Sequence, residues 1–226
     1  MREESVENLV IYGNGKIAKI VFHFLKNDFN VVAFTVDESF ISEPVIEGVP
    51  VVPFENIETK FSIENHKMIV AVGYVQMNHI RALKYQQAKE KGYSFANYIH
   101  PSVVLHGNVI VGENNVVMDH VAIQPYAKIG NGNIIWSNAV IAHGCTVEND
   151  NWIASGVVIS GDTTIKSKCF MGVNATVGHN IVIENENFIG ANALVTKSTM
   201  EKDVYITKEA EKFRLDSQRF LKFAGI

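Results

Sequence analysis

Residues 123–146 read IQPYAK, IGNGNI, IWSNAV and IAHGCT, four consecutive blocks of six that each begin with isoleucine. The same period extends in both directions, because every sixth residue from Ile99 to Val195 is aliphatic and no insertion breaks the register. A fixed six-residue repeat is typical of a parallel β-helix, in which each hexad supplies one short strand and one corner and three hexads complete a triangular coil. The repeat therefore predicts about six coils.

Other positions of the hexad indicate how the coils pack. Each aliphatic side chain is predicted to point into the prism and to stack on its equivalent one coil later, at the normal spacing of neighbouring strands. Four residues after it the side chain is small, β-branched or Asn, as at Ala127 and Cys145, which fits a tight corner. Several hexads have glycine directly after the aliphatic residue, and we expect these glycines to occupy corners that need unusual backbone angles. They are Gly112, Gly130, Gly172, Gly178 and Gly190.

A different pattern precedes the repeat. Apolar runs at 8–12, 31–36 and 68–72 read as strands, and residues at helical spacing follow the first and the third. Alternating strands and helices predict a small parallel sheet with helices on its faces. The segment 44–53 is expected to be a loop with a short extended piece.

The chain is therefore divided into three parts. Residues 1–95 are expected to form a small α/β (Rossmann-like) domain, residues 96–200 the parallel β-helix, and residues 201–226 a helical tail. In the tail, the amphipathic segment 208–222 predicts a helix that lies on or caps the last coil.

Composition excludes several classes of partner. The net charge is −4 and no run of Lys or Arg is present, which argues against binding to nucleic acid. The segment after Met1-Arg2-Glu3-Glu4 is strand-like rather than the core of a signal peptide, and no stretch approaches about 18 continuous apolar residues. We therefore expect a cytoplasmic protein without membrane insertion. Cys145 and Cys169 lack metal-motif spacing and are expected to be buried thiols.

Four short motifs resemble one group of enzymes. The unit Ile129-Gly130 at the start of its hexad resembles the hexapeptide acyltransferases. The motifs Gly13-Asn14-Gly15, Ile99-His100-Pro101-Ser102 and Ile141-Ala142-His143 are similar to those of the nucleotide-sugar acyltransferases related to sialic-acid O-acetyltransferases and bacillosamine-pathway N-acetyltransferases. The resemblance covers nearly the whole chain and implies a left-handed β-helix. It also implies a homotrimer in which the α/β domain binds a nucleotide-linked sugar and acyl-CoA lies between adjacent β-helices.

His143 is the candidate general base. It stands at the third position of the hexad that begins at Ile141 and should project outward near a corner, where the resemblance places the catalytic histidine of the family. A base there would take the proton of the acceptor as the acceptor attacks a thioester. A solvated surface histidine is the alternative on spacing alone. In related enzymes an acidic residue often follows this histidine, whereas Gly144 follows it here, so either another acid orients the imidazole or the imidazole works unaided.

The candidate residues for acetyl-CoA are partly fixed by the repeat. Gly161 and His179 follow His143 by one and two coils, so the three should lie on one edge of the prism. A glycine there would let the acyl end of the cosubstrate approach the backbone closely. The resemblance implies that the amides of Gly161, Val173 and Ala191 contact the pantetheine arm, with Gly161 N–H as an oxyanion donor. His179 is expected to be a groove wall or a trimer contact, and no metal is expected because no tight ligand cluster is present.

The candidate residues for the substrate follow the predicted strands of the first domain. The amides of Gly13, Asn14, Gly15 and Lys16, at the start of the first helix, are expected to meet a phosphate group. Asp37 follows the second strand and is expected to bind the base or a hydroxyl group. The same motif fits a nicotinamide cofactor, but the attached β-helix favours a sugar nucleotide.

The third strand is followed by a second set of candidates. Gly73, Tyr74, Asn78 and Arg81 come after it, at the sheet edge where ligands of such sheets bind. The alternative for Arg81 is a solvent-facing position on its helix.

The function expected from the sequence is transfer of an acetyl group from acetyl-CoA to the amino group of a nucleotide-linked deoxyamino sugar. The reaction would be a direct transfer in a ternary complex and would serve the synthesis of a bacterial surface polysaccharide, such as lipopolysaccharide, or of another glycan. Acetylation of a sugar hydroxyl is the alternative within the same chemistry. A non-catalytic trimeric scaffold or ligand-binding protein is the alternative of another class.

Overall fold

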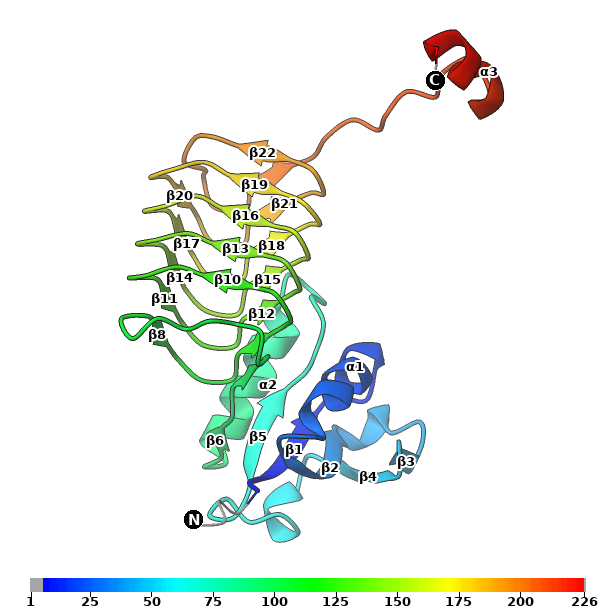
Figure 1. The fold of residues 1–226 in the computed structure, drawn as a ribbon. Helices are drawn as coiled ribbons and strands as arrows, with labels where there is room; N and C mark the ends of the chain where they lie inside the picture. The colour runs from blue at the N-terminus through cyan, green and yellow to red at the C-terminus, as the bar shows by residue number, and fades with distance from the viewer. Residues whose placement is uncertain (1–5, 226) are drawn as a thin grey trace.

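The computed structural model describes residues 6–225, so the predictions for residues 1–5 and 226 lie outside the described residues. An α/β domain lies at one end of a stack of coils, and a short C-terminal helix stands away from both (Figure 1). The elements of the α/β domain are β1 (Asn8–Tyr12), α1 (Lys16–Leu25), β2 (Asn30–Val36), β3 (Val45–Ile46), β4 (Val49–Pro53), β5 (Lys67–Val70), α2 (His79–Glu90) and β6 (Ser94–Phe95), with 3₁₀ turns at Glu38–Phe40 and Ile57–Thr59.

The domain is built on one sheet of order β3-β4-β2-β1-β5-β6, parallel except at β3. Leu9 and Ile11 face α1, whereas Val10 and Tyr12 face α2, so the apolar run of β1 is buried on both sides. The segment 44–53 is more ordered than predicted. It forms a hairpin whose second strand, β4, pairs in parallel with β2.

The coils consist of two-residue strands, as the hexad period predicts. They are β7 (Tyr98–Ile99), β8 (Ile110–Val111), β9 (Val116–Val117), β10 (Ala122–Ile123), β11 (Lys128–Ile129), β12 (Ile134–Ile135), β13 (Val140–Ile141), β14 (Thr146–Val147), β15 (Trp152–Ile153), β16 (Val158–Ile159), β17 (Thr164–Ile165), β18 (Phe170–Met171), β19 (Thr176–Val177), β20 (Val182–Ile183), β21 (Phe188–Ile189), β22 (Leu194–Val195) and β23 (Val204–Tyr205).

These strands form three parallel sheets. Sheet I has the order β23-β21-β18-β15-β12-β9-β7, sheet II β10-β13-β16-β19-β22, and sheet III β20-β17-β14-β11-β8. Three rows of corners separate the sheets. Corner A carries residues 125, 143, 161 and 179 between sheets II and III, corner B carries residues 131, 149 and 167 between III and I, and corner C carries residues 155, 173 and 191 between I and II.

The interior of the prism is filled by the aliphatic ladder. From Val117 to Val195, every sixth residue is at most 3% exposed. The prediction is wrong at Leu105, which is 42% exposed and lies in a segment without a strand. A strand in that segment would have to pair with the outer side of β10, but β10 is the edge strand of sheet II.

The prediction that the glycines directly after the aliphatic residues have unusual backbone angles is also wrong. The left-handed backbone conformation occurs three residues after the aliphatic residue, for example at Asn114, Gly132 and Gly144, and not at the glycine that directly follows it. Those glycines are required for a different reason. A Cβ on Gly112 would lie 2.6 Å from the carbonyl oxygen of Gly130, and one on Gly172 would lie 2.5 Å from the amide nitrogen of Ala191, so the stacked coils leave no room for a side chain.

The α/β domain packs on sheet I. Helix α1 and the outward side chains of sheet I share one core, which includes Leu9, Val21, Ile134 and Trp152. Aromatic rings continue this contact, because the Tyr74 ring lies 5.0 Å from that of Trp152 and 4.7 Å from that of Phe170. Sheet I is therefore covered by the domain of the same chain.

The C-terminal prediction is wrong about the position of the helix. Helix α3 (Ser217–Ala224) is shorter than the predicted 208–222 segment and does not lie on the last coil (Figure 1). Asp216 starts it, because its side chain accepts the amide N–H of Arg219. The end of sheet I is closed instead by β23, which pairs with β21.

Candidate active site

Corner A brings His143 and Gly161 into contact. His143 is exposed, and its imidazole ring lies over Gly161, since a Cβ on Gly161 would be 2.6 Å from Nε2 and 2.7 Å from Cε1. His179 follows on the same corner and is also exposed. The glycine therefore makes the space in which the imidazole lies.

Gln124 is a neighbour of His143 that the sequence analysis did not single out. Its side-chain oxygen accepts the backbone N–H of His143 at 3.0 Å and lies 3.4 Å from Nδ1 of the same residue. The two residues belong to adjacent coils and are 19 positions apart. The residue one whole coil before His143 is Pro125, so a comparison of equivalent positions in the repeat does not identify Gln124.

The predicted acetyl-CoA residues lie on two different corners. Gly161 and His179 are on corner A, whereas Val173 and Ala191 are on corner C, across sheet II. Within residues 6–225, the amide N–H groups of Gly161, Val173 and Ala191 donate to no acceptor. By contrast, on corner B the amides of Asn131 and Ser167 are capped by side chains of the next coil. Corners A and C thus present free hydrogen-bond donors to a ligand.

The Gly13 to Lys16 turn is built as the strand-turn-helix pattern predicts. Gly13 has φ 127°, and a Cβ there would be 2.8 Å from the carbonyl oxygen of Ala71. Gly15 precedes the first turn of α1 with open space around its Cα, and the first turn carries no acidic residue. A Cβ on Gly73 would lie 3.6 Å from Cγ1 of Ile17, so the turns after β1 and β5 lie side by side. The Asn14 side chain donates to the carbonyl oxygen of Phe40.

Asp37 is already paired within the domain. Lys84 Nζ lies 2.6 and 2.8 Å from its two carboxylate oxygens, and the Tyr12 hydroxyl donates to it at 2.9 Å. Burial, together with the nearby Asp37 carboxylate, raises the pKa of Tyr12 well above its ordinary value. Asp37 and Lys84 line a cavity of about 480 Å³ beside α2.

Asn78 and Arg81 lie inside the junction between the domain and the coils, where both are 0% exposed. The Arg81 guanidinium donates to the carbonyl oxygens of Gly132, Asp150 and Asn151 on corner B, and to those of Val72 and the Asn78 side chain. The Asn78 amide donates to the carbonyl oxygen of Cys169. These contacts join the two parts of the chain, and neither the ligand-binding nor the solvent-facing expectation for Arg81 describes this position.

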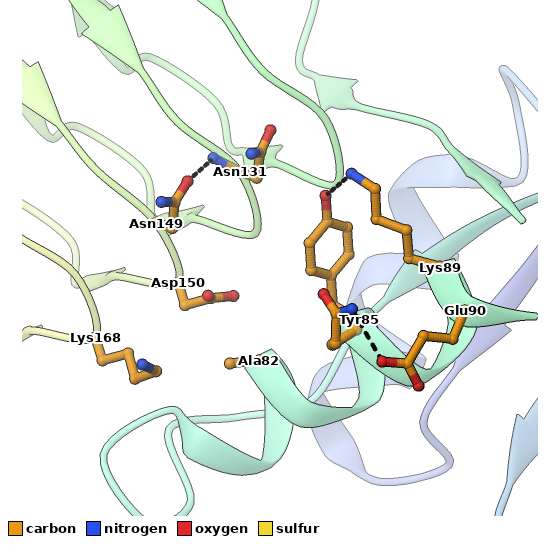
Figure 2. Close-up of a pocket in the computed structure, with 9 residues that line it drawn as sticks. Ala82, Tyr85, Lys89, Glu90, Asn131, Asn149, Asp150 and Lys168 are labelled. Carbon is orange, nitrogen blue, oxygen red and sulfur yellow. Dashed lines mark hydrogen bonds between the residues drawn. The ribbon is translucent and has the colours of Figure 1, made fainter. Parts of the chain in front are cut away.

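Burial in the junction also shifts the pKa values of Arg81 and Asp150. Burial lowers the pKa of Arg81 to about 10 and raises that of Asp150 to about 6, although the attraction of the Arg81 charge opposes the rise for Asp150. Asp150 faces a cavity of about 590 Å³ between α2 and corner B, which Lys89, Asn149 and Lys168 also line (Figure 2). This cavity is on a different corner from His143.

Both cysteines are buried and unpaired, as expected. Burial raises the pKa of Cys169 to about 12. Among residues 6–225 no group of three or more His, Cys, Asp and Glu side chains is placed to hold a metal ion. None of the described helices is long and apolar enough to cross a membrane.

Comparison with known proteins agrees with this architecture. The family model for the bacterial transferase hexapeptide (six repeats) matches residues 126–161. No curated protein matches the sequence. Among solved structures, the acetyltransferase domain of PglB from Neisseria gonorrhoeae is 23% identical, with a TM-score of 0.79 over 88% of this chain and 95% of that chain. Its complex with acetyl coenzyme A is 24% identical, with a TM-score of 0.77 over 85% and 92% of the two chains.

A third solved structure has higher identity. PerB from Caulobacter crescentus, in complex with CoA and GDP-perosamine, is 29% identical, with a TM-score of 0.79 over 88% of this chain and 94% of that chain. These matches confirm the predicted fold, a left-handed parallel β-helix with an N-terminal α/β domain and a C-terminal helix. The chain is therefore similar to the hexapeptide-repeat nucleotide-sugar acetyltransferases.

Proposed function

We propose that this protein transfers the acetyl group of acetyl-CoA to the amino group of a nucleotide-linked deoxyamino sugar, with His143 as the general base. The observation that carries the proposal is the imidazole of His143 over Gly161, whose amide N–H is free, on an exposed corner of the prism. PerB, at 29% identity, was solved with CoA and GDP-perosamine, and the perosamine N-acetyltransferase of Caulobacter crescentus, solved as a mutant with the same two ligands, is 28% identical, which supports both substrates. Acetyl-CoA and nucleotide sugars are made in the cytoplasm, where the reaction would supply a bacterial surface polysaccharide.

The chemistry requires one base and one oxyanion donor. Nε2 of His143 takes a proton from the sugar amine while the nitrogen attacks the thioester carbonyl carbon. The Gly161 N–H donates to the oxygen that becomes negative. The carbon–sulfur bond then breaks, and the protonated imidazole returns its proton to the CoA thiolate, so no covalent intermediate on the protein is needed. A sugar hydroxyl would react in the same geometry, which keeps O-acetylation as the second candidate.

The proposed site needs more than one copy of the chain. The Gly13 to Lys16 turn belongs to the domain that covers sheet I, and corner A is the corner that sheet I does not touch. Val173 and Ala191 are on corner C, so they also face away from His143 of their own chain. Sheet II has the small and apolar outward side chains that a neighbouring copy would cover, among them the exposed Val158 and Leu194. A homotrimer of side-by-side prisms would bring corner A of one copy to corner C of the next.

Two experiments test this proposal. Isothermal titration with acetyl-CoA and with UDP-, dTDP- and GDP-linked amino sugars identifies the pair that binds, and thiol release measures the transfer. His143→Ala should abolish thiol release, whereas His23→Ala, at an exposed position on α1, should not. Absence of CoA binding, or binding of a nicotinamide cofactor instead, would overturn the assignment in favour of the scaffold or dehydrogenase-like alternatives.

Subunit complementation tests the shared site. Gly15→Glu places a carboxylate in open space at the start of α1, where it should repel a phosphate group without disturbing the fold. If each substrate site uses the two chains as proposed, a refolded mixture of His143→Ala and Gly15→Glu subunits recovers activity that neither variant has alone. A mixture that stays inactive while it is trimeric contradicts the arrangement.

A further inference from the structure

We propose that Gln124 is the positioning residue of His143: its side-chain oxygen holds the proton on Nδ1 and so leaves Nε2 as the basic nitrogen. This inference rests on the proposed function for its catalytic meaning, but the protonated nitrogen of His143 can be measured without any substrate. It also answers what orients the imidazole when Gly144 stands where related enzymes often have an acid.

The orientation of the Gln124 amide is fixed by the backbone. The atom 3.0 Å from the backbone nitrogen of His143 must be an acceptor, because a backbone N–H can only donate. It is therefore the amide oxygen rather than the amide nitrogen. Gln124 itself is held in place, since its backbone N–H donates to the carbonyl oxygen of Ile141 in the adjacent strand.

The protonated nitrogen of the neutral imidazole follows from this orientation. The same oxygen lies 3.4 Å from Nδ1, and two acceptors facing each other would repel, so Nδ1 carries the hydrogen. The lone pair is then on Nε2. Nε2 is the nitrogen over Gly161, whose amide N–H is free and is the proposed oxyanion donor. The fixed Nδ1–H therefore leaves the base on the side of the ring where the reaction needs it.

The rest of the corner explains why Gln124 has this role. On corner B the backbone N–H of Asn131 is capped by Asn149, the residue one coil later on the same corner. On corner A the equivalent residue is Gly161, which has no side chain because the imidazole needs its space. The cap for His143 therefore comes from the preceding coil, and the side chain that supplies it also reaches the ring.

Other ionisable groups belong to corner A or to the positions next to it, but they make no hydrogen bond to the ring among residues 6–225. Asp162 belongs to the next coil, and its carboxylate lies over Gly144; Tyr126 belongs to the preceding coil, and His179 lies two coils further along corner A. Only the Gln124 oxygen lies within hydrogen-bond distance of a ring nitrogen in this described part of the chain. The orienting group is thus a neutral amide.

The test uses the full-length protein with labelled histidine. In wild type without substrates, ring ¹⁵N and ¹³C shifts should report the Nδ1–H form of neutral His143. Gln124→Met keeps the length of the side chain but removes the acceptor, so we expect the Nε2–H form to appear and kcat to fall by about 10- to 100-fold, the cost typical of losing the partner that orients a metal-bound histidine, with KM little changed. Gln218→Met, the same substitution at an exposed position of α3, is the matched control and should change neither quantity.

Gln124→Glu supplies a second, opposite test. It keeps the acceptor and adds a negative charge, which favours the imidazolium, so the acid limb of the pH–rate profile should move to higher pH while the Nδ1–H form is retained. An Nε2–H form in wild type, or an unchanged proton position in Gln124→Met, refutes the proposal whatever the activity. If instead His143→Ala remains active, the proposed base is wrong even where the NMR result holds, so the two failures are distinguishable.

Discussion

Replacing Gly161 by alanine would show whether the imidazole of His143 must lie where the structure puts it. The added Cβ would be 2.6 Å from Nε2, whereas non-bonded heavy atoms prefer separations of about 3.5–4.0 Å. The ring must therefore retreat by about 1 Å. A displacement of about 1 Å in a reacting group costs about 100-fold in rate. We expect kcat of Gly161→Ala to fall by about that factor.

The fold should survive this substitution. The atoms that the new methyl group meets belong to the free end of an exposed side chain, and not to backbone that is fixed in the stack. We expect a change in the free energy of unfolding of less than about 1 kcal/mol. Thiol release and thermal denaturation on the same preparation separate the two effects. Gly107→Ala, with no atom within 4 Å of its added Cβ, is the matched control.

Two results would refute the reasoning. If Gly161→Ala keeps kcat within about threefold of wild type while His143→Ala is inactive, the imidazole does not act from its place over Gly161. If Gly161→Ala unfolds, the glycine is required by the coil and the contact with the ring is incidental. A loss of rate without a loss of stability is the expected outcome.

Three further predictions concern the junction and the tail. Arg81→Met leaves the buried carbonyl oxygens of Gly132 and Asp150 without a donor and should cost about 3 kcal/mol or more, seen as a fall in Tm, while Arg214→Met in the exposed tail costs nothing measurable. Because the folded pKa of Asp150, about 6, is above its unfolded value, stability should fall as pH rises from 4 to 7, by at most about 3 kcal/mol, and Asp150→Asn should remove that slope in Tm-against-pH measurements. Removing residues 208–226 should leave Tm unchanged within about 1 °C, since the described side chains of this segment are exposed or half-exposed; a fall in Tm would show that the tail packs on a coil.

The β-helix could be predicted from the sequence because each hexad repeats one local structure. The aliphatic position must be apolar in every coil, and this requirement is visible residue by residue. The position of the left-handed corner residue could have been predicted as well. Asn, Asp or Gly occupies the fourth position of most hexads, as at Asn138, Gly144 and Asp162, and these residues tolerate the left-handed conformation best. The glycines at the second position are easier to notice, but they are required by close packing between coils and not by the left-handed conformation.

The site was less predictable because its residues come from surfaces that the sequence does not show together. Asn78 and Arg81 follow β5 at an edge where ligands bind in such sheets, but here the coils cover that edge. Nothing in the α/β part of the sequence indicates what covers it. The six-residue period did predict that Gly161 lies beside His143, because the two residues are one coil apart.

The neighbour that orients His143 shows the limit of reading along the chain. In this prism the residue after the corner histidine has the left-handed backbone conformation. Gly144 occupies that position, and the Asp162 carboxylate lies over it. An acidic side chain at 144 would take up a strained backbone and would collide with Asp162. The contacts of the imidazole are therefore made across coils, to Gln124 before it and Gly161 after it. A search for catalytic partners in this fold should accordingly compare residues one coil away, including those displaced by one position, before it compares residues adjacent in sequence.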